Sequence, residues 1–259
     1  MARHAARFFD EPKAAKVPEI TPLFWAIKIL TTAGGEATSD YLSLHNKVTG
    51  GAIEITVFAL AMTLQFRVRR YYAVYYWFLA YSIATAGTGV ADTMHLTIGL
   101  PYSVTTVFWA VVLGAIFWYW QRTEGTLSIH SILTRRREFD YWATVFATFA
   151  LGTALGDFTA RALYLGYLAS GIAFAAFITL PGLFWKFARL NEIAAFWMAY
   201  VLTRPLGASF ADYFSKPHAL SGANYGDGPT AVVLTIIIIG LVSYTAVARY
   251  DIQEPTRQR

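Results

Sequence analysis

The sequence contains no cysteine and few charged residues. Of its 259 residues only 14% are charged, whereas a soluble domain carries about 25%. Without cysteine the chain cannot form disulfide bonds or bind zinc or an iron–sulfur cluster through thiolates. It also lacks the HExxH, P-loop and nucleophile-elbow motifs, so neither an enzyme nor a resident cofactor is expected. The hydrophobic fraction of 56% indicates an all-α integral membrane protein whose main partner is the lipid bilayer.

Apolar stretches of about 20 residues predict about eight transmembrane helices. They cover residues 22–43, 49–66, 71–95, 101–120, 139–163, 164–184, 192–214 and 228–249. Arg and Lys cluster near residues 3–16, 67–70, 122–137, 186–189 and 249–259, whereas the opposite connections hold Lys47 and Lys216. By the positive-inside rule both termini are cytoplasmic. The basic residues are then explained by topology and by anionic lipid headgroups, so no nucleic-acid partner is expected.

The same charge pattern predicts the organisation of the chain. A cytoplasmic tail, residues 1–20, precedes a four-helix half, residues 21–120. A basic cytoplasmic loop, residues 121–138, separates it from a second four-helix half, residues 139–249, and a cytoplasmic tail, residues 250–259.

A repeated pattern marks the odd-numbered helices. An aromatic residue and Trp are followed after nine residues by Gly and after four more by Asp, in four copies that begin at Phe24, Tyr76, Tyr141 and Phe196. All copies start on the basic side, so the pattern predicts four parallel two-helix repeats about an axis normal to the membrane. We expect the glycines to permit close helix packing and the tryptophans to anchor the helices at the interface.

Ionisable residues inside these apolar spans are the candidate functional residues, because such groups normally face a partner or a water-filled cavity. Glu36 lies one turn before Asp40 on the same helix face, and Thr88 and Thr153 occupy the position of Glu36 in the second and third copies. The predicted ion- or substrate-binding residues all offer oxygen: Glu36, Asp40, Glu54, Asp92, Asp157, Asp212, Thr32, Thr88 and Thr153, with Glu36 and Asp40 as metal ligands.

Three basic residues are predicted to balance this negative charge: Lys28, Arg161 and Arg204. Lys28 is expected to reach an acid or the inner interface. Arg161 follows Asp157 by one turn and can pair with it. Pro205, directly after Arg204, is expected to break its helix and free backbone carbonyls.

In and just before the first span the chain has the pattern KVPE…FW…K…T…GE…D, formed by Lys16, Val17, Pro18, Glu19, Phe24, Trp25, Lys28, Thr31, Gly35, Glu36 and Asp40. This pattern resembles the signature of a family of bacterial polytopic proteins usually called uncharacterised membrane-anchored proteins. The resemblance implies a location in the bacterial cytoplasmic (inner) membrane. It supplies no activity, so function is argued from the oxygen ligands.

Carboxylates and Thr hydroxyls without cysteine suit hard cations such as Mn²⁺, Mg²⁺ or Ca²⁺. We therefore expect a secondary transporter that couples export of a divalent cation to protons, the ion being cargo. Two alternatives remain open. One is a transporter of a small organic ion, with Arg161 and Arg204 as anion contacts. The other is a non-transporting scaffold or partner subunit in which the acids form salt bridges with no continuous cavity.

Overall fold

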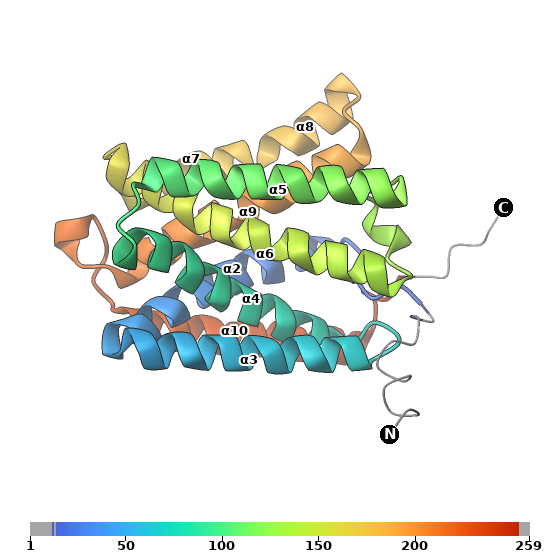
Figure 1. Ribbon diagram of the computed structural model, residues 1–259, viewed down its shortest axis with the longest axis horizontal. Helices are drawn as coiled ribbons and strands as arrows, with labels where there is room; N and C mark the ends of the chain where they lie inside the picture. Colours follow the sequence, from blue (N-terminus) through green and yellow to red (C-terminus); the bar gives the residue numbers. More distant parts are fainter. Residues whose placement is uncertain (1–11, 13, 254–259) are drawn as a thin grey trace.

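Helix is the regular secondary structure of the described part of the chain, which contains no strand. The computed structural model describes residue 12 and residues 14–253. Its long elements are α2 (Pro22–His45), α3 (Lys47–Arg67), α4 (Ala73–Asp92), α5 (Tyr102–Glu124), α6 (Arg135–Asp157), α7 (Tyr167–Phe177), α8 (Thr179–Ala188), α9 (Glu192–Ser215) and α10 (Asp227–Ala248), as Figure 1 shows. Four short segments join them: η1 (Thr93–Thr97), η2 (Ile129–Ser131), η3 (Phe158–Ala162) and η4 (His218–Leu220). Helix lies at every predicted span, and the sixth is divided into α7 and α8.

Polar caps fix where the first helices begin. The Thr21 hydroxyl accepts a hydrogen bond from the Phe24 amide, and Pro22 occupies the first turn, where its missing N–H costs nothing. The Asn46 side chain accepts from the Val48 and Thr49 amides and starts α3 directly after α2. This single-residue connection turns the chain back sharply, so α2 and α3 lie side by side.

Four helices form a closed inner ring. Helix α2 contacts α4, α4 contacts α6, α6 contacts α9, and α9 contacts α2. These are the helices that carry the repeated pattern. Equivalent residues of different helices meet at two levels: Tyr76 and Tyr141 near the tryptophans, and Glu36, Thr88 and Thr153 eleven residues after them. Helices α2 and α9 meet the same order of levels, because Phe24 packs on Trp77 and Trp197 on Tyr141 at the first level, while Asp212 lies near Asp40 beyond the second. The four inner helices therefore run in the same direction.

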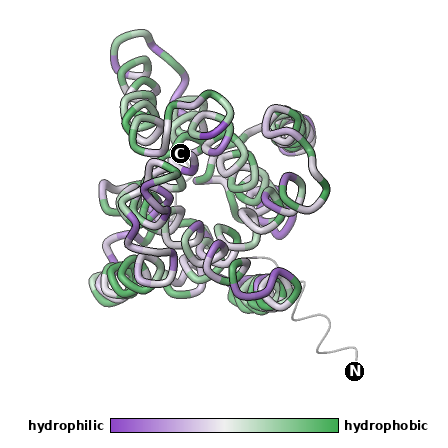
Figure 2. Tube along the Cα trace, turned by 90° about the vertical axis from the view of Figure 1, so that its left-hand side faces the viewer, coloured by the Kyte–Doolittle hydropathy of each residue, from purple (hydrophilic) through white to green (hydrophobic). Residues whose placement is uncertain are grey.

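The remaining helices form an outer layer. Helix α3 packs on α4, α5 on α6, α7 and α8 on α9, and α10 on α2. Each outer helix thus follows one inner helix in sequence and packs on the next inner helix around the ring. Viewed along the helices, Figure 2 shows the most hydrophobic segments at the periphery.

Within residues 14–253, five helices are long and apolar enough to cross a membrane, judged by length and composition. They are α3, α5, α6 together with η3, α7 together with α8, and α10. In the most apolar window of the outer helices 22% of residues are buried, against 72% in α6. Helices α2, α4 and α9 are not in this set, because their inward faces carry acids, threonines and glycines.

The repeated glycines close the ring. A Cβ atom on Gly35 would collide with Ala84, one on Gly87 with Phe149, one on Gly152 with Arg204, and one on Gly207 with Thr32. In each case the glycine faces the residue that lies seven positions after the Trp of the next inner helix. The glycine of the fourth inner helix, α9, faces the first, α2, so the contacts run around the whole ring. The prediction of close packing at these glycines is therefore confirmed.

The tryptophans belong to a packed aromatic layer. Trp77, Trp142 and Trp197 are 2%, 2% and 4% exposed, and the ring of Phe24 lies 5.6 Å from that of Trp77. The prediction that the repeated tryptophans anchor at the interface is wrong for these three, because they fill the space between helices; the fourth, Trp25, is half-buried.

The segment before α2 is tied to the same end of the bundle. The buried Lys16 ammonium lies 2.5 Å from the Glu138 carboxylate of α6 and donates to the Gln65 carbonyl at the end of α3. The Glu19 amide donates to the carbonyl of Asp251 beyond α10. The Lys-Val-Pro-Glu segment therefore links three helices at the aromatic end of the ring.

Candidate functional site

Arg204 lies at the centre of the inner ring and is fully buried. Its guanidinium donates to the backbone carbonyls of Thr32 at 2.6 Å, Phe149 at 3.2 Å and Ala84 at 3.3 Å. These carbonyls come from the three other inner helices, at the same position in each copy. Helix α9 runs through Pro205 without a break, so the expectation of a broken helix is wrong. Arg204 instead finds its acceptors on the neighbouring helices.

Glu36 is the ionic partner of Arg204. Its carboxylate accepts from the guanidinium at 2.6 Å, from the Thr88 hydroxyl at 2.8 Å and from the Thr153 hydroxyl at 3.1 Å. The guanidinium also donates to both hydroxyls. A buried ion pair needs such additional hydrogen bonds to offset the loss of hydration. Glu36 and the two threonines therefore form one layer, as the sequence predicts.

A pocket of about 160 Å³ opens directly beyond this layer. The repeated aspartates of all four copies line it: Asp40, Asp92, Asp157 and Asp212. One turn further on, the wall is made by Leu44, Leu96, Arg161 and Lys216, which are equivalent to one another in the four copies. Since Leu44, Leu96 and Lys47 are exposed, this rim is the open end of the pocket.

Two cations at the rim pair with part of the acid cluster. The Lys216 ammonium lies 2.6 Å from Asp40, 3.0 Å from Asp227 and 3.8 Å from Asp212. Burial alone would lower the pKa of Lys216, but these carboxylates outweigh burial and raise it, so the ammonium stays charged. Arg161 lies 3.3 Å from Asp157.

Arg161 is fixed by two phenols as well as by Asp157. It donates to the Tyr167 hydroxyl at 2.6 Å and to the Tyr102 hydroxyl at 3.2 Å. The predicted pairing with Asp157 is therefore present, and the arginine is oriented at the rim.

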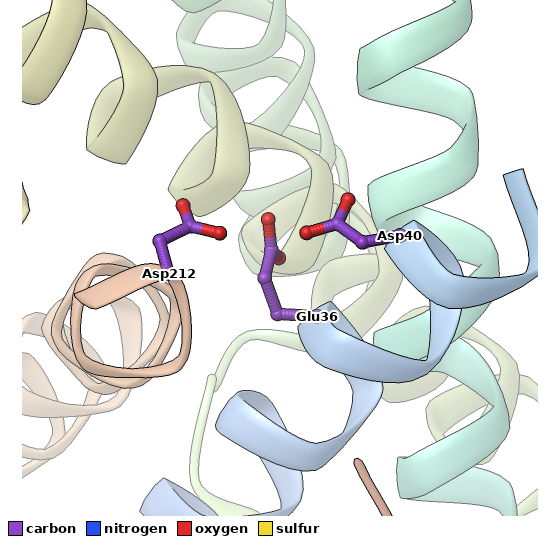
Figure 3. Close-up of side chains that lie close together, drawn as sticks. All are labelled: Glu36, Asp40 and Asp212. Atoms are coloured by element: carbon purple, nitrogen blue, oxygen red, sulfur yellow. The ribbon is translucent and has the colours of Figure 1, made fainter. Parts of the chain in front are cut away.

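Three carboxylates converge at the base of the pocket. Oxygen atoms of Glu36, Asp40 and Asp212 lie within 4.8 Å of one another, and Figure 3 shows the carboxylates turned toward a common point. One Asp212 oxygen is buried and has no hydrogen-bond partner among the described residues. Oxygen ligands at about 2.0–2.6 Å from one cation lie no more than about 5 Å apart. The spacing therefore fits a hard metal ion, whose ligands would come from these three residues.

Asp92 differs from the other pocket aspartates. Among the residues that the structure describes it forms neither a hydrogen bond nor an ion pair. The charged groups that act on its carboxylate are mainly other acids, Asp40, Asp157 and Glu36. Asp92 ends α4 where the chain passes into the π-helical segment η1, as Asp157 ends α6 before η3. Such π-helical turns often occur at functional sites.

The pocket has a small excess of negative charge, which favours binding of a cation. The carboxylates in the pocket or directly behind it are those of Glu36, Asp40, Asp92, Asp157, Asp212 and Asp227. The positively charged side chains at the same place are those of Lys47, Arg161, Arg204 and Lys216. With every group ionised, two negative charges remain. One divalent cation or two protons would neutralise them.

Two predicted binding residues, Glu54 and Thr32, have side chains that belong neither to the pocket nor to the layer of Glu36, Thr88 and Thr153 behind it. Glu54 is buried behind α2, where its carboxylate accepts from Ser39 at 2.6 Å and fills the space beside Gly89. The Thr32 hydroxyl donates to the carbonyls of Ile29 and Thr203 and closes the contact between α2 and α9.

Lys28 also lies away from the pocket, on the aromatic side of Arg204. Its ammonium is 4.0 Å from the Phe149 ring and 4.2 Å from the Tyr200 ring and has no hydrogen-bond partner among the described residues. The expectation that Lys28 reaches an acid or the interface is therefore wrong. Its side chain ends between two aromatic rings instead, where cation–π attraction partly replaces hydration.

Lys216, Tyr102 and Asp227 are site residues that the sequence reasoning did not select. Lys216 follows Asp212 by four residues, as Arg161 follows Asp157, and this spacing on one helix face is the signal that identifies it. Tyr102 and Asp227 begin other helices, and nothing in their local sequence points to the pocket.

A family of repeat proteins matches the chain. The family described as Repeat of Unknown Function (DUF347) matches residues 75–126, 141–191 and 195–250. The matches begin at or next to the aromatic-Trp pairs of the second, third and fourth copies. The first copy carries the same spacing but lies outside the matched residues. No curated protein and no solved structure matches the chain. Because the three matches together cover more than half of its length, the chain belongs to the family of proteins built from the Repeat of Unknown Function (DUF347).

Proposed function

We propose that this protein is a secondary transporter that exchanges a hard divalent cation, such as Mn²⁺, Mg²⁺ or Ca²⁺, for protons. The observation that carries the proposal is the convergence of the four repeated aspartates and Glu36 on one pocket that opens at one end of the helix ring. Carboxyl groups in apolar helices are costly unless they serve a hydrated or ion-binding space. Here they come from four different helices and share that space.

The proposed membrane arrangement follows from the same features. We take α2, α3, α4, α5, α6, α7 together with α8, α9 and α10 as eight spans, in four parallel two-helix repeats, with both termini in the cytoplasm. The basic connections support this orientation through the positive-inside rule, and they place the aromatic layer toward the cytoplasm and the pocket toward the opposite side. The resemblance of the first span to bacterial membrane-anchored proteins supports a bacterial inner membrane.

Ion and proton binding share the same carboxylates in this proposal. Glu36, Asp40 and Asp212 supply the ligands, and Lys216 moves away from Asp40 when the ion enters. The two excess negative charges of the pocket match either one divalent cation or two protons. Exchange then needs no further charged group, because the pocket is neutral whether it holds one divalent cation or two protons. The cations already present lower the affinity for the metal and so permit its release.

Flux measurements in proteoliposomes test the proposal. Mn²⁺ uptake by the wild-type protein should saturate and should respond to a pH gradient. Asp212→Asn should abolish the response while preserving the fold, because the one ion-pair contact of Asp212 with the described residues is the 3.8 Å contact with Lys216. Glu192→Gln is the matched control, since Glu192 is exposed at the start of α9. Wild-type protein that binds no metal and moves none would contradict the proposal and would favour the scaffold.

A further inference from the structure

The oxygens around Arg204 come from equivalent positions on the other three inner helices. The residues seven positions after each Trp, Thr32, Ala84 and Phe149, supply carbonyls. The residues eleven positions after each Trp, Glu36, Thr88 and Thr153, supply side-chain oxygens. Positions repeated in this way around a closed ring surround its axis. The guanidinium is thus a dehydrated cation held on the axis by six protein oxygens.

Such a set of oxygens is a cation site in its own right. Carbonyl and hydroxyl oxygens replace the hydration shell of ions in selectivity filters. Each helix carbonyl keeps a second lone pair after its helical hydrogen bond, so the three carbonyls can accept from Arg204. The buried Glu36 carboxylate adds a full negative charge. In this protein the cation that fills the ring is covalently attached to α9.

The position of Arg204 separates the pocket from the aromatic end. On the pocket side, the Glu36 carboxylate pairs with the guanidinium and also lies within 4.8 Å of carboxylate oxygens of Asp40 and Asp212. On the other side, the Phe149 ring lies under the guanidinium, at 5.0 Å, and under the Lys28 ammonium, at 4.0 Å.

The layer beyond Lys28 is packed with phenol side chains. Tyr76 and Tyr141 share a hydrogen bond of 2.5 Å, and both are fully buried. A cation that moves along the axis from the pocket must therefore pass the position of the guanidinium before it meets this layer.

Glu36 links the two sites. A cation held by Glu36, Asp40 and Asp212 competes with Arg204 for the same carboxylate, so its entry weakens the ion pair that holds the guanidinium in the ring. We propose that the oxygen ring is an axial cation site and that Arg204 is a tethered cation which fills it and closes the pathway until an ion in the pocket engages Glu36. The gating part rests on the proposed function; the axial site does not.

Chemical rescue tests the axial site directly. Arg204→Ala leaves an opening of guanidinium shape lined by six oxygens, so millimolar guanidinium should raise the thermal unfolding temperature of this variant, and sodium chloride at equal ionic strength should not. Arg161→Ala is the matched control: Arg161 is 35% exposed at the rim, and guanidinium should not stabilise this variant. A folded Arg204→Ala protein that guanidinium does not stabilise would overturn the axial site.

Leak measurements test the gate. A pH gradient across Arg204→Ala proteoliposomes should decay about tenfold faster than across wild-type ones, which corresponds to a barrier lowered by about 1.4 kcal/mol, and guanidinium should slow this decay. If Arg204→Ala does not fold, Arg204→Lys keeps the charge but cannot reach all six oxygens, and it should leak in the same direction. A folded variant whose pH gradient decays no faster than that of the wild type would refute the gate. Wild-type protein that moves no metal, combined with successful rescue, would refute the transporter and keep the axial site.

Discussion

The closure of the inner ring through glycine can be tested at Gly35. A Cβ atom at this position would lie 2.9 Å from the Ala84 backbone carbon and 3.0 Å from the Thr85 nitrogen, and closer still to the Ala84 Cβ. Carbon atoms in contact lie about 3.5–4.0 Å apart. Because the obstructing atoms belong to helix backbone, rotamer changes cannot relieve the overlap. Gly35→Ala must therefore move α2 and α4 apart by about 1 Å.

The magnitude follows from two opposing effects. Forcing a methyl group into a packed interior costs about 1–3 kcal/mol, whereas replacing Gly with Ala inside a helix gains up to about 1 kcal/mol. Gly114 supplies the control, because a Cβ atom there meets nothing within 4 Å. The propensity gain is common to both variants and cancels in the comparison. Gly35→Ala should thus be about 1–3 kcal/mol less stable than Gly114→Ala.

Thermal unfolding in detergent measures this difference, and the eight tryptophans provide the fluorescence signal. For a chain of this size, 1 kcal/mol corresponds to about 2–4 °C, so the two variants should differ by about 2–12 °C. Separation of the helices also stretches the 3.3 Å hydrogen bond between Arg204 and the Ala84 carbonyl. Equal unfolding temperatures for Gly35→Ala and Gly114→Ala would show that the ring is not closed by this contact.

Two further predictions concern the pocket and the segment before α2. Asp92→Asn should leave the unfolding temperature nearly unchanged, because Asp92 has no ion-pair partner among the described residues. It should weaken Mn²⁺ binding measured by calorimetry. An unchanged affinity would show that Asp92 is not part of the site. Burial lowers the pKa of Lys16 from 10.5 to about 8, against the attraction of Glu138. Between these pH values the folded protein has released a proton that the unfolded chain still holds. The stability of the wild type relative to Lys16→Met should therefore rise with pH across this window, by at most about 3 kcal/mol, and parallel melting curves at all pH values would contradict this reasoning.

Much of the fold could be predicted from local sequence. Helices lie at every predicted span, because long apolar stretches must satisfy their backbone groups internally in lipid. Their limits differ by a few residues where capping decides: α6 starts at Arg135 after the Thr134 cap, earlier than hydropathy indicates. The break at Ile178 between α7 and α8 has no hydropathy signal and was not predicted.

The site could be predicted only in part. The repeat spacing placed the four aspartates at one depth, and the pocket brings them together. Glu54 lies at a suitable position along α3, yet its helix is in the outer layer, so its carboxylate meets Ser39 instead of the pocket. Depth along a helix can be read from residue spacing, whereas the direction in which a helix faces depends on its neighbours.

The sequence by itself determined the helical, strongly apolar character of this protein and the register of its four copies, because both follow from composition and from the fixed rise and period of a helix. Only the tertiary structure decided which charges meet. Arg204 enters the ring of Glu36, Thr88 and Thr153, and Lys216 pairs with Asp40 from 176 residues away. These pairings depend on the order of the helices around the ring and on the rotation of each helix about its own axis. Every packing contact in the ring contributes to that order and to those rotations.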